Sequence, residues 1–344
     1  MEFGSFYEFP VRRGQSEAGA FDEGFELVDD AERLGLDAFW LSETHVAPGR
    51  SVLASPMIIA SAIAGRTERM KIGLAVHVLP LGNPLRMAEE GATLDQISKG
   101  RLIFGVGRSG FQRAYDAYGI PYAESQARFA EALAILRKAW TEPTFSYDGH
   151  WHSYHDVSLS PRPFQQPYPE IRVAANSPPS FERFGAEGLK IFIGIRQGGV
   201  SRMAPLVQAY RAAYQAAGHP GNGGVFLRIP IHVAETVDQA VREPEQSITE
   251  YFWSRNTKGS RPSLASISGD PLDEASDLIT WDELREERVV TGTPRMVVDR
   301  LRELRDLLGL DGILAEINSG GEIPQPLVRR SLCLLCDEVM PAFQ

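Results

Sequence analysis

Short apolar runs alternate with longer amphipathic stretches along most of this chain. Runs of this kind are typical of buried parallel strands, and the stretches between them are typical of helical crossovers. Eight runs are predicted to be strands: Glu2–Phe6, Asp37–Leu41, Lys71–Val78, Arg101–Val106, Ile171–Ala175, Lys190–Ile195, Val225–Val233 and Gly312–Ile317. Eight strand–helix units close into a barrel more readily than they form an open sheet, so we expect an α/β fold of the (β/α)8 TIM barrel type. A doubly wound sheet is the alternative.

Capping residues mark several of the predicted helices. Apolar residues recur at helical spacing over residues 21–34, and Gly35 follows where a C-terminal capping glycine belongs. A second helix is predicted over Pro84–Ser98. A third stretch, Thr293–Leu308, begins with a capping residue followed by proline at the first helical position, and it ends before Gly309.

Two segments depart from the repeat. Pro143–Pro169 is rich in Pro, His and Tyr, and Glu235–Val290 contains a long polar stretch. We expect both insertions to lie between a strand and its helix, after the predicted strands four and seven. Loops that follow strands form the active-site face of a barrel, so Ser254–Ser276 is a candidate lid, with a disordered linker as the alternative. The chain, residues 1–344, is expected to form one domain.

Composition narrows the class of protein. Hydrophobic residues make up 43% of the 344 residues and charged residues 23%, which is typical of soluble globular proteins, and no apolar run reaches the roughly 18 residues of a membrane helix. No secretory signal is recognised, so a cytoplasmic location is expected. Acidic residues outnumber basic ones by 45 to 35, which disfavours nucleic acid and anionic membranes as partners. A small molecule is the expected partner.

Cysteines and clustered histidines indicate neither redox nor metal chemistry. Cys333 and Cys336 are the only cysteines and lie in a segment with helical periodicity, so we expect buried thiols rather than a redox pair. His150, His152 and His155 have a spacing that metal sites can show, but no carboxylate or cysteine completes a convincing set. No metal is expected.

Long segments of the chain resemble bacterial luciferase and its relatives. The segment KIGLAVHVLPLGNPLRMAEEGATLDQISKGRLIFGVGRSGFQRAYDAYG (71–119) resembles the central part of that family, and GTPRMVVDRLRELRDLLGLDGILAEI (292–317) resembles its last strand–helix units. The resemblance implies a monooxygenase that uses reduced FMN, supplied by a separate flavin reductase, and O2 to oxidise a small, largely apolar organic substrate. Hydroxylation, epoxidation and Baeyer–Villiger oxidation stay open. A homodimer is expected. The alternatives are an F420-dependent oxidoreductase of the same fold and a noncatalytic flavin-binding subunit.

The resemblance also implies an FMN phosphate site. Arg108 matches the arginine that contacts the phosphate, with Phe111 in the same loop, and a planar guanidinium suits two phosphate oxygens. Asn176, Ser177 and Ser180 match the strand-to-helix turn that supplies amide and hydroxyl donors to the phosphate, and Ala174 and Ala175, just before them, are also expected to bind the cofactor. A turn that opens a helix presents free N–H groups to an anion, although either serine alone would pass for an ordinary N-cap. Gln126 stands where relatives carry a second arginine, with Arg128 two residues further on, so we expect one charge fewer at the phosphate.

The candidate catalytic residues are Glu43, Thr44 and His45, in the segment LSETH. The family commonly carries Glu-His-His here, facing the reactive edge of the flavin, and Thr44 replaces the first histidine. His45 is expected to donate or remove a proton, with a purely structural role as the alternative.

Other positions of the predicted site follow from the same comparison. Ala75 and Val76 match a non-proline cis peptide beneath the flavin ring, and Gly107 is expected to open room beside it. His77 and His232 fall in predicted strands, and we expect that they can point into the barrel.

Overall fold

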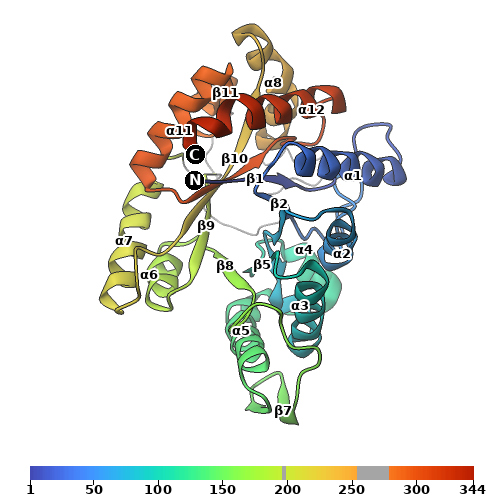
Figure 1. Ribbon diagram of the computed structural model, residues 1–344, viewed down its shortest axis with the longest axis vertical. Coiled ribbons are helices and arrows are strands. Elements are labelled where there is room, and N and C mark those ends of the chain that lie inside the picture. Colours follow the sequence, from blue (N-terminus) through green and yellow to red (C-terminus); the bar gives the residue numbers. More distant parts are fainter. Residues whose placement is uncertain (196–198, 254–278) are drawn as a thin grey trace.

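Eight parallel strands form a closed barrel in the computed structural model, which describes residues 1–195, 199–253 and 279–344 (Figure 1). In chain order these strands are β1 (Glu2–Tyr7), β2 (Ala38–Leu41), β3 (Lys71–Leu74), β5 (Leu102–Gly107), β8 (Glu170–Ala174), β9 (Lys190–Gly194), β10 (Val225–Val233) and β12 (Gly312–Glu316). Each pairs with the next, and β12 returns to β1 with Gly312 opposite Glu2. The predicted (β/α)8 TIM barrel is confirmed, and an open doubly wound sheet is excluded.

Helices cover the outside of the barrel (Figure 1). They are α1 (Glu17–Arg33), α2 (Pro56–Arg66), α3 (Pro84–Ser98), α4 (Gln112–Tyr118), α5 (Ser125–Thr141), α6 (Pro178–Ala186), α7 (Met203–Ala216), α8 (Val237–Trp253), α10 (Trp281–Glu287), α11 (Pro294–Leu308) and α12 (Gln325–Leu334). The three helices predicted from the sequence correspond to α1, α3 and α11. The side chain of Asn83 accepts a hydrogen bond from the Arg86 N–H at the start of α3, and Gly309 adopts the left-handed conformation expected of a C-cap.

The third predicted strand is interrupted. β3 ends at Leu74, and the chain resumes as the short strand β4 (His77–Val78), which pairs with β5. The peptide bond between Ala75 and Val76 is cis, as the family resemblance implied. The side chains on the two sides of this bond therefore do not follow the alternation of a regular strand.

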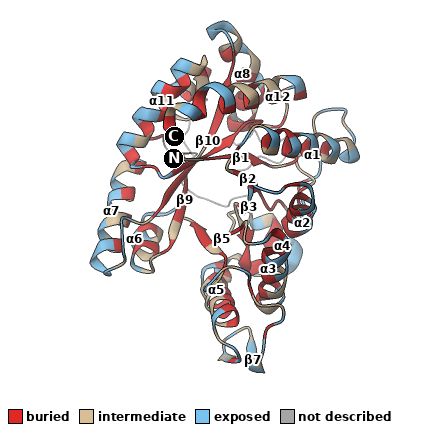
Figure 2. Ribbon diagram, in the orientation of Figure 1, coloured by how far each residue is buried: buried red, intermediate tan, exposed pale blue. Residues whose placement is uncertain are grey.

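Two apolar layers hold the barrel together, and Figure 2 shows its strands as largely buried. Outward-facing side chains pack against the helices. Inward-facing side chains fill the barrel with a second cluster, which includes Phe6, Trp40, Phe192, Phe226 and Leu314. The rings of Trp40 and Phe192 meet edge to face at 5.1 Å. The interior is therefore a packed core and no open pore.

A buried arginine closes the amino-terminal end of the barrel. Arg172 is 1% exposed, and its guanidinium lies 2.7 Å from Glu2 and 2.6 Å from Glu170. The same guanidinium lies 3.5 Å from the centre of the Phe226 ring. Burial raises the pKa of Glu2, but hydrogen bonding and attraction from Arg172 outweigh it and lower that pKa.

The two insertions lie at different places in the fold. Pro143–Pro169 contains the antiparallel hairpin of β6 (Phe145–Asp148) and β7 (Ser153–Val157). It lies between helix α5 and strand β8, so the expectation that it separates a strand from its helix was wrong. Glu235–Val290 does follow β10 and contains α8 and α10, with β11 (Val290–Gly292) pairing with β10 at its end. The candidate lid, Ser254–Ser276, lies outside the described residues.

Candidate active site

A buried carboxylate just beyond β2 joins two histidines. Oε1 of Glu43 lies 2.6 Å from Nε2 of His45, and its Oε2 lies 2.5 Å from Nδ1 of His77. The backbone N–H of Val78 donates a third hydrogen bond of 3.0 Å to Oε2. The side chains of Glu43, His77 and His45 are 5%, 9% and 11% exposed, so all three interact away from bulk water.

Glu43 is ionised in this setting. Burial raises its pKa, but attraction to His77 and the hydrogen bonds from both imidazoles outweigh burial and lower the pKa to about 2. A buried charge needs partners for its lone pairs, and here each oxygen has one. Glu43 therefore acts as a fixed negative charge at neutral pH.

The ionised carboxylate determines which ring nitrogen of each neutral histidine carries the proton. A carboxylate only accepts hydrogen bonds, so His45 presents Nε2–H to it and His77 presents Nδ1–H. The Nδ1 atom of His45 is then an acceptor, and it lies 3.2 Å from the hydroxyl of Tyr118 in α4. Because Tyr118 is 51% exposed, His45 lies between a buried anion and a group that reaches solvent.

Thr44 has a different role from a histidine at this position. Its side chain is buried, with Oγ1 3.3 Å from the hydroxyl of Ser42, and its N–H donates to the carbonyl of Leu53 at 2.9 Å. A threonine hydroxyl does not titrate near neutrality. Among the three predicted catalytic residues, His45 has the side chain suited to proton transfer near neutral pH, and Glu43 is its hydrogen-bond partner.

The space beside Gly107 is already filled. A Cβ built on Gly107 would lie 2.4 Å from Cγ2 of Val76, so a glycine is needed for β5 to approach the chain at the cis peptide. The extra room expected at this position is occupied by the side chain of Val76, and that expectation was wrong. By contrast, a Cβ built on Gly194, at the end of β9, meets no atom within 4 Å.

Arg108 presents an exposed guanidinium in the loop after β5. Its Nη1 donates a hydrogen bond of 2.9 Å to the hydroxyl of Ser125, at the start of α5, and the guanidinium lies 5.8 Å from the centre of the Tyr122 ring. In the described part of the chain the guanidinium makes no other hydrogen bond. One side is thus anchored, and the remaining N–H groups are available to an anion.

The residues around Arg108 do not replace the missing second arginine. Arg128 forms an ion pair of 2.8 Å with Glu124 and lies 4.7 Å from the centre of the Trp151 ring. Gln126 is exposed in the first turn of α5 and adds no charge. Phe111 immediately precedes α4, with the guanidinium of Arg50 5.5 Å from its ring centre.

The turn after β8 contains Ala175, Asn176 and Ser177, between Ala174 at the end of β8 and Ser180 in the first turn of α6. It has fewer backbone donors than we expected, because the first two residues of α6 are the prolines 178 and 179, which lack an N–H. The N–H of Ser177 donates to the hydroxyl of Ser180 at 3.2 Å. The side chains of Asn176 and Ser177 are exposed, so side chains supply most of the donors available here.

Strand pairing places these groups along one half of the barrel mouth. β2, β3, β5 and β8 are consecutive neighbours in the sheet. Glu43 and His45 follow the first of these strands, the cis peptide the second, Arg108 the third and the serine turn the fourth. Since all strands are parallel, their carboxyl ends open on the same face, and the predicted site residues lie on neighbouring loops.

The other half of the mouth carries a chain of alternating charges. Arg228 in β10 contacts Glu316 at the end of β12 at 2.9 and 3.1 Å, and its guanidinium lies 3.5 Å from the centre of the Phe6 ring. Glu8, after β1, lies 3.5 Å from Arg228 and 3.0 Å from Arg50. These contacts connect the loops after β1 and β2 to β10 and β12.

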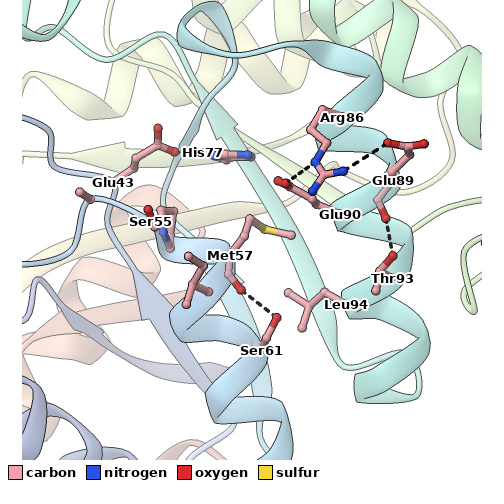
Figure 3. A pocket seen from close by; sticks show the side chains of 13 residues that line it. Glu43, Ser55, Met57, Ser61, His77, Arg86, Glu89, Glu90, Thr93 and Leu94 are labelled. Atoms are coloured by element: carbon pink, nitrogen blue, oxygen red, sulfur yellow. Dashed lines mark hydrogen bonds and ion pairs between the residues drawn. The ribbon is translucent and has the colours of Figure 1, made fainter. Parts of the chain in front are cut away.

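A cavity of about 410 Å³ lies outside the barrel, between α2 and α3 (Figure 3). Glu43 and His77 line its inner end, and Arg86 pairs with Glu90 at 2.8 Å on the α3 side. Figure 3 shows the far edge of the His77 ring directed between the two helices. That edge carries Nε2, which is buried and has no hydrogen-bond partner within the described residues.

The expectation that the two strand histidines point into the barrel was wrong. His77 follows the cis peptide, and its ring packs edge to face on Phe104, which in turn packs on Trp140 of α5. His232 lies in the part of β10 that pairs with β11, and its Nε2 is 2.8 Å from Glu243 of α8. Both rings therefore face helices.

Sequence reasoning missed three contacts that complete the site. Tyr118 was an ordinary helical residue in the sequence, and Ser125 was indistinguishable from a helix-capping serine. His77 was noticed as a histidine in a strand, but its pairing with Glu43 depends on the break between β3 and β4. Asn83 and Pro84, six and seven residues after His77, mark the start of α3, but no residue marks the break between β3 and β4.

Within residues 1–195, 199–253 and 279–344, no three His, Cys, Asp or Glu side chains gather as metal ligands. No helix in these ranges combines the length and apolar character needed to cross a membrane. The predicted buried thiol is confirmed for Cys336, and burial raises its pKa to about 12. Cys333 is only half-buried.

Comparison with known proteins agrees with the geometry. The sequence matches a family described as luciferase-like monooxygenase over residues 1–311. It is 26% identical over 350 residues to the oxygenase component of the flavin-dependent trigonelline monooxygenase of Acinetobacter baylyi, covering 100% of this chain and 96% of that protein. It is 31% identical over 242 residues to the F420-dependent glucose-6-phosphate dehydrogenase of Kineococcus radiotolerans, covering 67% and 70%.

Among solved structures, the oxygenating constituent of 3,6-diketocamphane monooxygenase from Pseudomonas putida superposes with a TM-score of 0.81. That protein is described as a type II Baeyer–Villiger monooxygenase in complex with FMN. The two chains share 24% sequence identity over 99% of this chain and 98% of that one. At this level of identity the likeness supports the barrel fold.

Proposed function

The chain belongs to the luciferase-like monooxygenase family, and we propose that it is the oxygenase of a two-component system. In this proposal it binds reduced FMN, which a separate reductase supplies, and uses O2 to oxidise a small, largely apolar organic substrate. The observation that carries the proposal is the row of loops after β2, β3, β5 and β8. It combines an anion site, small residues and a histidine held by a carboxylate.

Arg108 and the serine turn are suited to hold the FMN phosphate. Val106 pairs with Val173, so the loops after β5 and β8 start side by side. Arg108 offers a guanidinium anchored by Ser125, and Asn176 with Ser177 offers exposed polar side chains. The arginine contributes the only cationic side chain among these groups. We expect phosphate affinity to depend strongly on it.

Small side chains between these groups are suited to a flat ring system. Ala75 and Ala174 lie at the ends of β3 and β8, Val76 covers Gly107 at the end of β5 between them, and Gly194 leaves open space at the end of β9. FMN, when bound in its reduced form, would supply the electrons and the reaction with O2. The protein would position the ring and keep water from the reacting atoms.

His45 is the proposed proton-transfer residue. Its Nε2–H is bound to Glu43, and its Nδ1 faces Tyr118 at the edge of α4. A substrate or cofactor atom that displaces the tyrosine hydroxyl would meet an acceptor nitrogen in the neutral ring and a donor in the charged ring. Glu43 stabilises the charged ring, which makes His45 able to hold a proton during turnover.

The proposed substrate lies over the apolar barrel interior, in the half of the mouth that the flavin leaves free. Phe6 and Phe192 belong to this interior, and Arg228 with Glu316 forms its polar margin. This arrangement favours a substrate with an apolar body. Hydroxylation, epoxidation and Baeyer–Villiger oxidation are not distinguished by it.

We also propose that the protein is a cytoplasmic homodimer. Ile58 of α2 and Ile97 of α3 are 69% and 52% exposed, and large exposed apolar side chains on neighbouring helices favour an interface. Light scattering on the purified protein tests this proposal, with a monomeric mass at all concentrations as the contrary result.

Anaerobic titration separates the proposed function from its alternatives. The protein would be titrated with reduced FMN and, in parallel, with reduced F420, and then mixed with 18O2 and candidate substrates such as cyclic ketones and terpenes. Tight binding of reduced FMN followed by one 18O atom per product molecule supports the proposal. Preference for F420 with no oxygen incorporation would establish the deazaflavin alternative. FMN binding without turnover of any substrate would support a noncatalytic subunit.

A further inference from the structure

We propose that His77 is a positioning residue that sets the orientation and charge state of His45 through Glu43. The inference deepens the proposed function, because it matters for catalysis only if His45 transfers a proton there. His77 itself faces the helices and does not reach the mouth of the barrel. It acts on the mouth through the carboxylate alone.

Two imidazoles share this one carboxylate, each on its own oxygen. The two contacts, at 2.5 and 2.6 Å, are hydrogen bonds from imidazole N–H groups to an ionised acceptor. The Val78 N–H adds a bond of 3.0 Å to the oxygen that His77 already holds. Glu43 is thus fixed from the His77 side, and only the other oxygen is left to orient His45.

Sharing one negative charge makes the two histidines compete for it. Each hydrogen bond to Glu43 partly neutralises the same negative charge, so the N–H donor of His77 reduces how strongly the carboxylate stabilises a proton on His45. The groups around the trio do not remove this competition. On the α4 side the neighbours are the phenol groups of Tyr115 and Tyr118, and burial raises the pKa of Tyr115.

On the cavity side, α2 contributes no charged side chain. Arg86 of α3 is already paired with Glu89 and Glu90 of its own helix. Apart from these residues, Glu43 and His77, no charged side chain of the described part of the chain lines the cavity. His77 therefore limits how much of the Glu43 charge acts on His45.

The far side of the His77 ring supports a role directed at Glu43. Its Nε2 is buried without a partner among the described residues and faces the cavity between α2 and α3. Within residues 1–195, 199–253 and 279–344, the Nδ1–H is thus the only polar contact of the ring. Asparagine can place an amide N–H near the Nδ1 position, whereas phenylalanine preserves ring packing on Phe104 and removes the donor. The two substitutions form a matched pair.

The experiment measures His45 directly in the flavin-free protein. Imidazole NMR signals would be assigned with a His45→Gln variant and followed through a pH titration in the parent, His77→Asn and His77→Phe proteins. Without the His77 donor the full carboxylate charge acts on His45. We expect its titration midpoint in His77→Phe to rise by about one pH unit, and in His77→Asn to stay close to that of the parent.

The pH profile of kcat/KM gives the catalytic readout. The acidic limb of this profile should shift to higher pH in His77→Phe and keep its position in His77→Asn, while KM for the substrate changes little. If His77→Phe does not fold, His77→Gln takes its place, because its longer side chain carries the amide toward the Nε2 position and away from Glu43. Equal His45 midpoints in folded parent and donor-free variants would overturn the inference. Because the NMR titration needs no flavin, failure of the monooxygenase assay would leave it intact.

Discussion

The guanidinium of Arg108 is anchored to the hydroxyl of Ser125 at 2.9 Å, across the space between the loop after β5 and the start of α5. Ser125 is 1% exposed, whereas Arg108 is exposed. A buried serine thus fixes one edge of an arginine whose other N–H groups face outward. This geometry preorganises a single cation for an anion, and the predictions about cofactor binding start from it.

Arg108→Ala should weaken binding of reduced FMN and leave the fold intact. A charge-assisted pair with a phosphate contributes about 1.5–3 kcal/mol, so the dissociation constant should rise about tenfold to a hundredfold. Anaerobic fluorescence titration measures it. Arg128→Ala is the matched control, because that side chain is already paired with Glu124, and it should bind FMN like the parent. Equal loss in both variants would show that Arg108 has no special place in the site.

His45→Ala should bind reduced FMN normally and form product more slowly, by on the order of 10²-fold, the usual contribution of a proton-transfer group. Stopped-flow kinetics and product analysis separate the two steps. Tyr118→Phe removes only the hydroxyl beside Nδ1 and should have a smaller effect. Full turnover in His45→Ala would reduce this histidine to a packing role.

Glu43 should make stability depend on pH in a defined window. Its folded-state pKa of about 2 lies below the ordinary value of 4.5, so the unfolded chain binds the proton first as the pH falls. The stabilisation is therefore complete above about pH 4.5 and is lost toward about pH 2. Other buried carboxylates such as Glu2 act in the same direction. The difference between parent and Glu43→Gln in urea unfolding, measured at about pH 6 and about pH 3, isolates this one, and it should shrink at the lower pH. A difference that does not change with pH would contradict the prediction.

Arg172→Met should destabilise the fold by about 3–5 kcal/mol, because it leaves Glu2 and Glu170 without their buried partner. Urea unfolding monitored by circular dichroism measures the loss. Arg66→Met breaks a solvent-exposed pair with Asp29 and should have a much smaller effect. FMN affinity should be unchanged in folded Arg172→Met, since this arginine closes the opposite end of the barrel from Arg108. Similar stabilities for the two variants would refute the assignment of a structural role to the buried pair.

The fold could be predicted from the sequence because barrel strands are apolar on both faces and because helix-capping residues lie next to the helix ends that they mark. Pro84–Ser98 could be located from its proline, its periodicity and its end alone. Composition marks Pro143–Pro169 as an insertion, but it does not show at which end of the barrel the insertion lies. Two helices, α4 and α5, follow β5, and the sequence does not show that the insertion comes after both of them.

Only part of the site could be predicted from the sequence, and the physical reason differs from one residue to the next. Arg108 and the serine turn follow strands, and their loops are predictable once the strands are known. Val76 fills the space beside Gly107 at the break between β3 and β4, where the sequence shows only two small apolar residues. The pairing of His77 with Glu43 joins residues 34 positions apart through the same irregularity.

The split of the barrel mouth into two halves has a consequence for how readily the enzyme can acquire new substrates. The proposed flavin contacts follow β2, β3, β5 and β8, whereas Phe192, Arg228 and Glu316 belong to β9, β10 and β12. The second set touches the first where Phe192 packs on Trp40 and where Glu8 links Arg228 to Arg50. A combinatorial library at these three positions, with Trp40, Glu8 and Arg50 kept, would therefore test whether substrate preference can change while the affinity for FMN is retained.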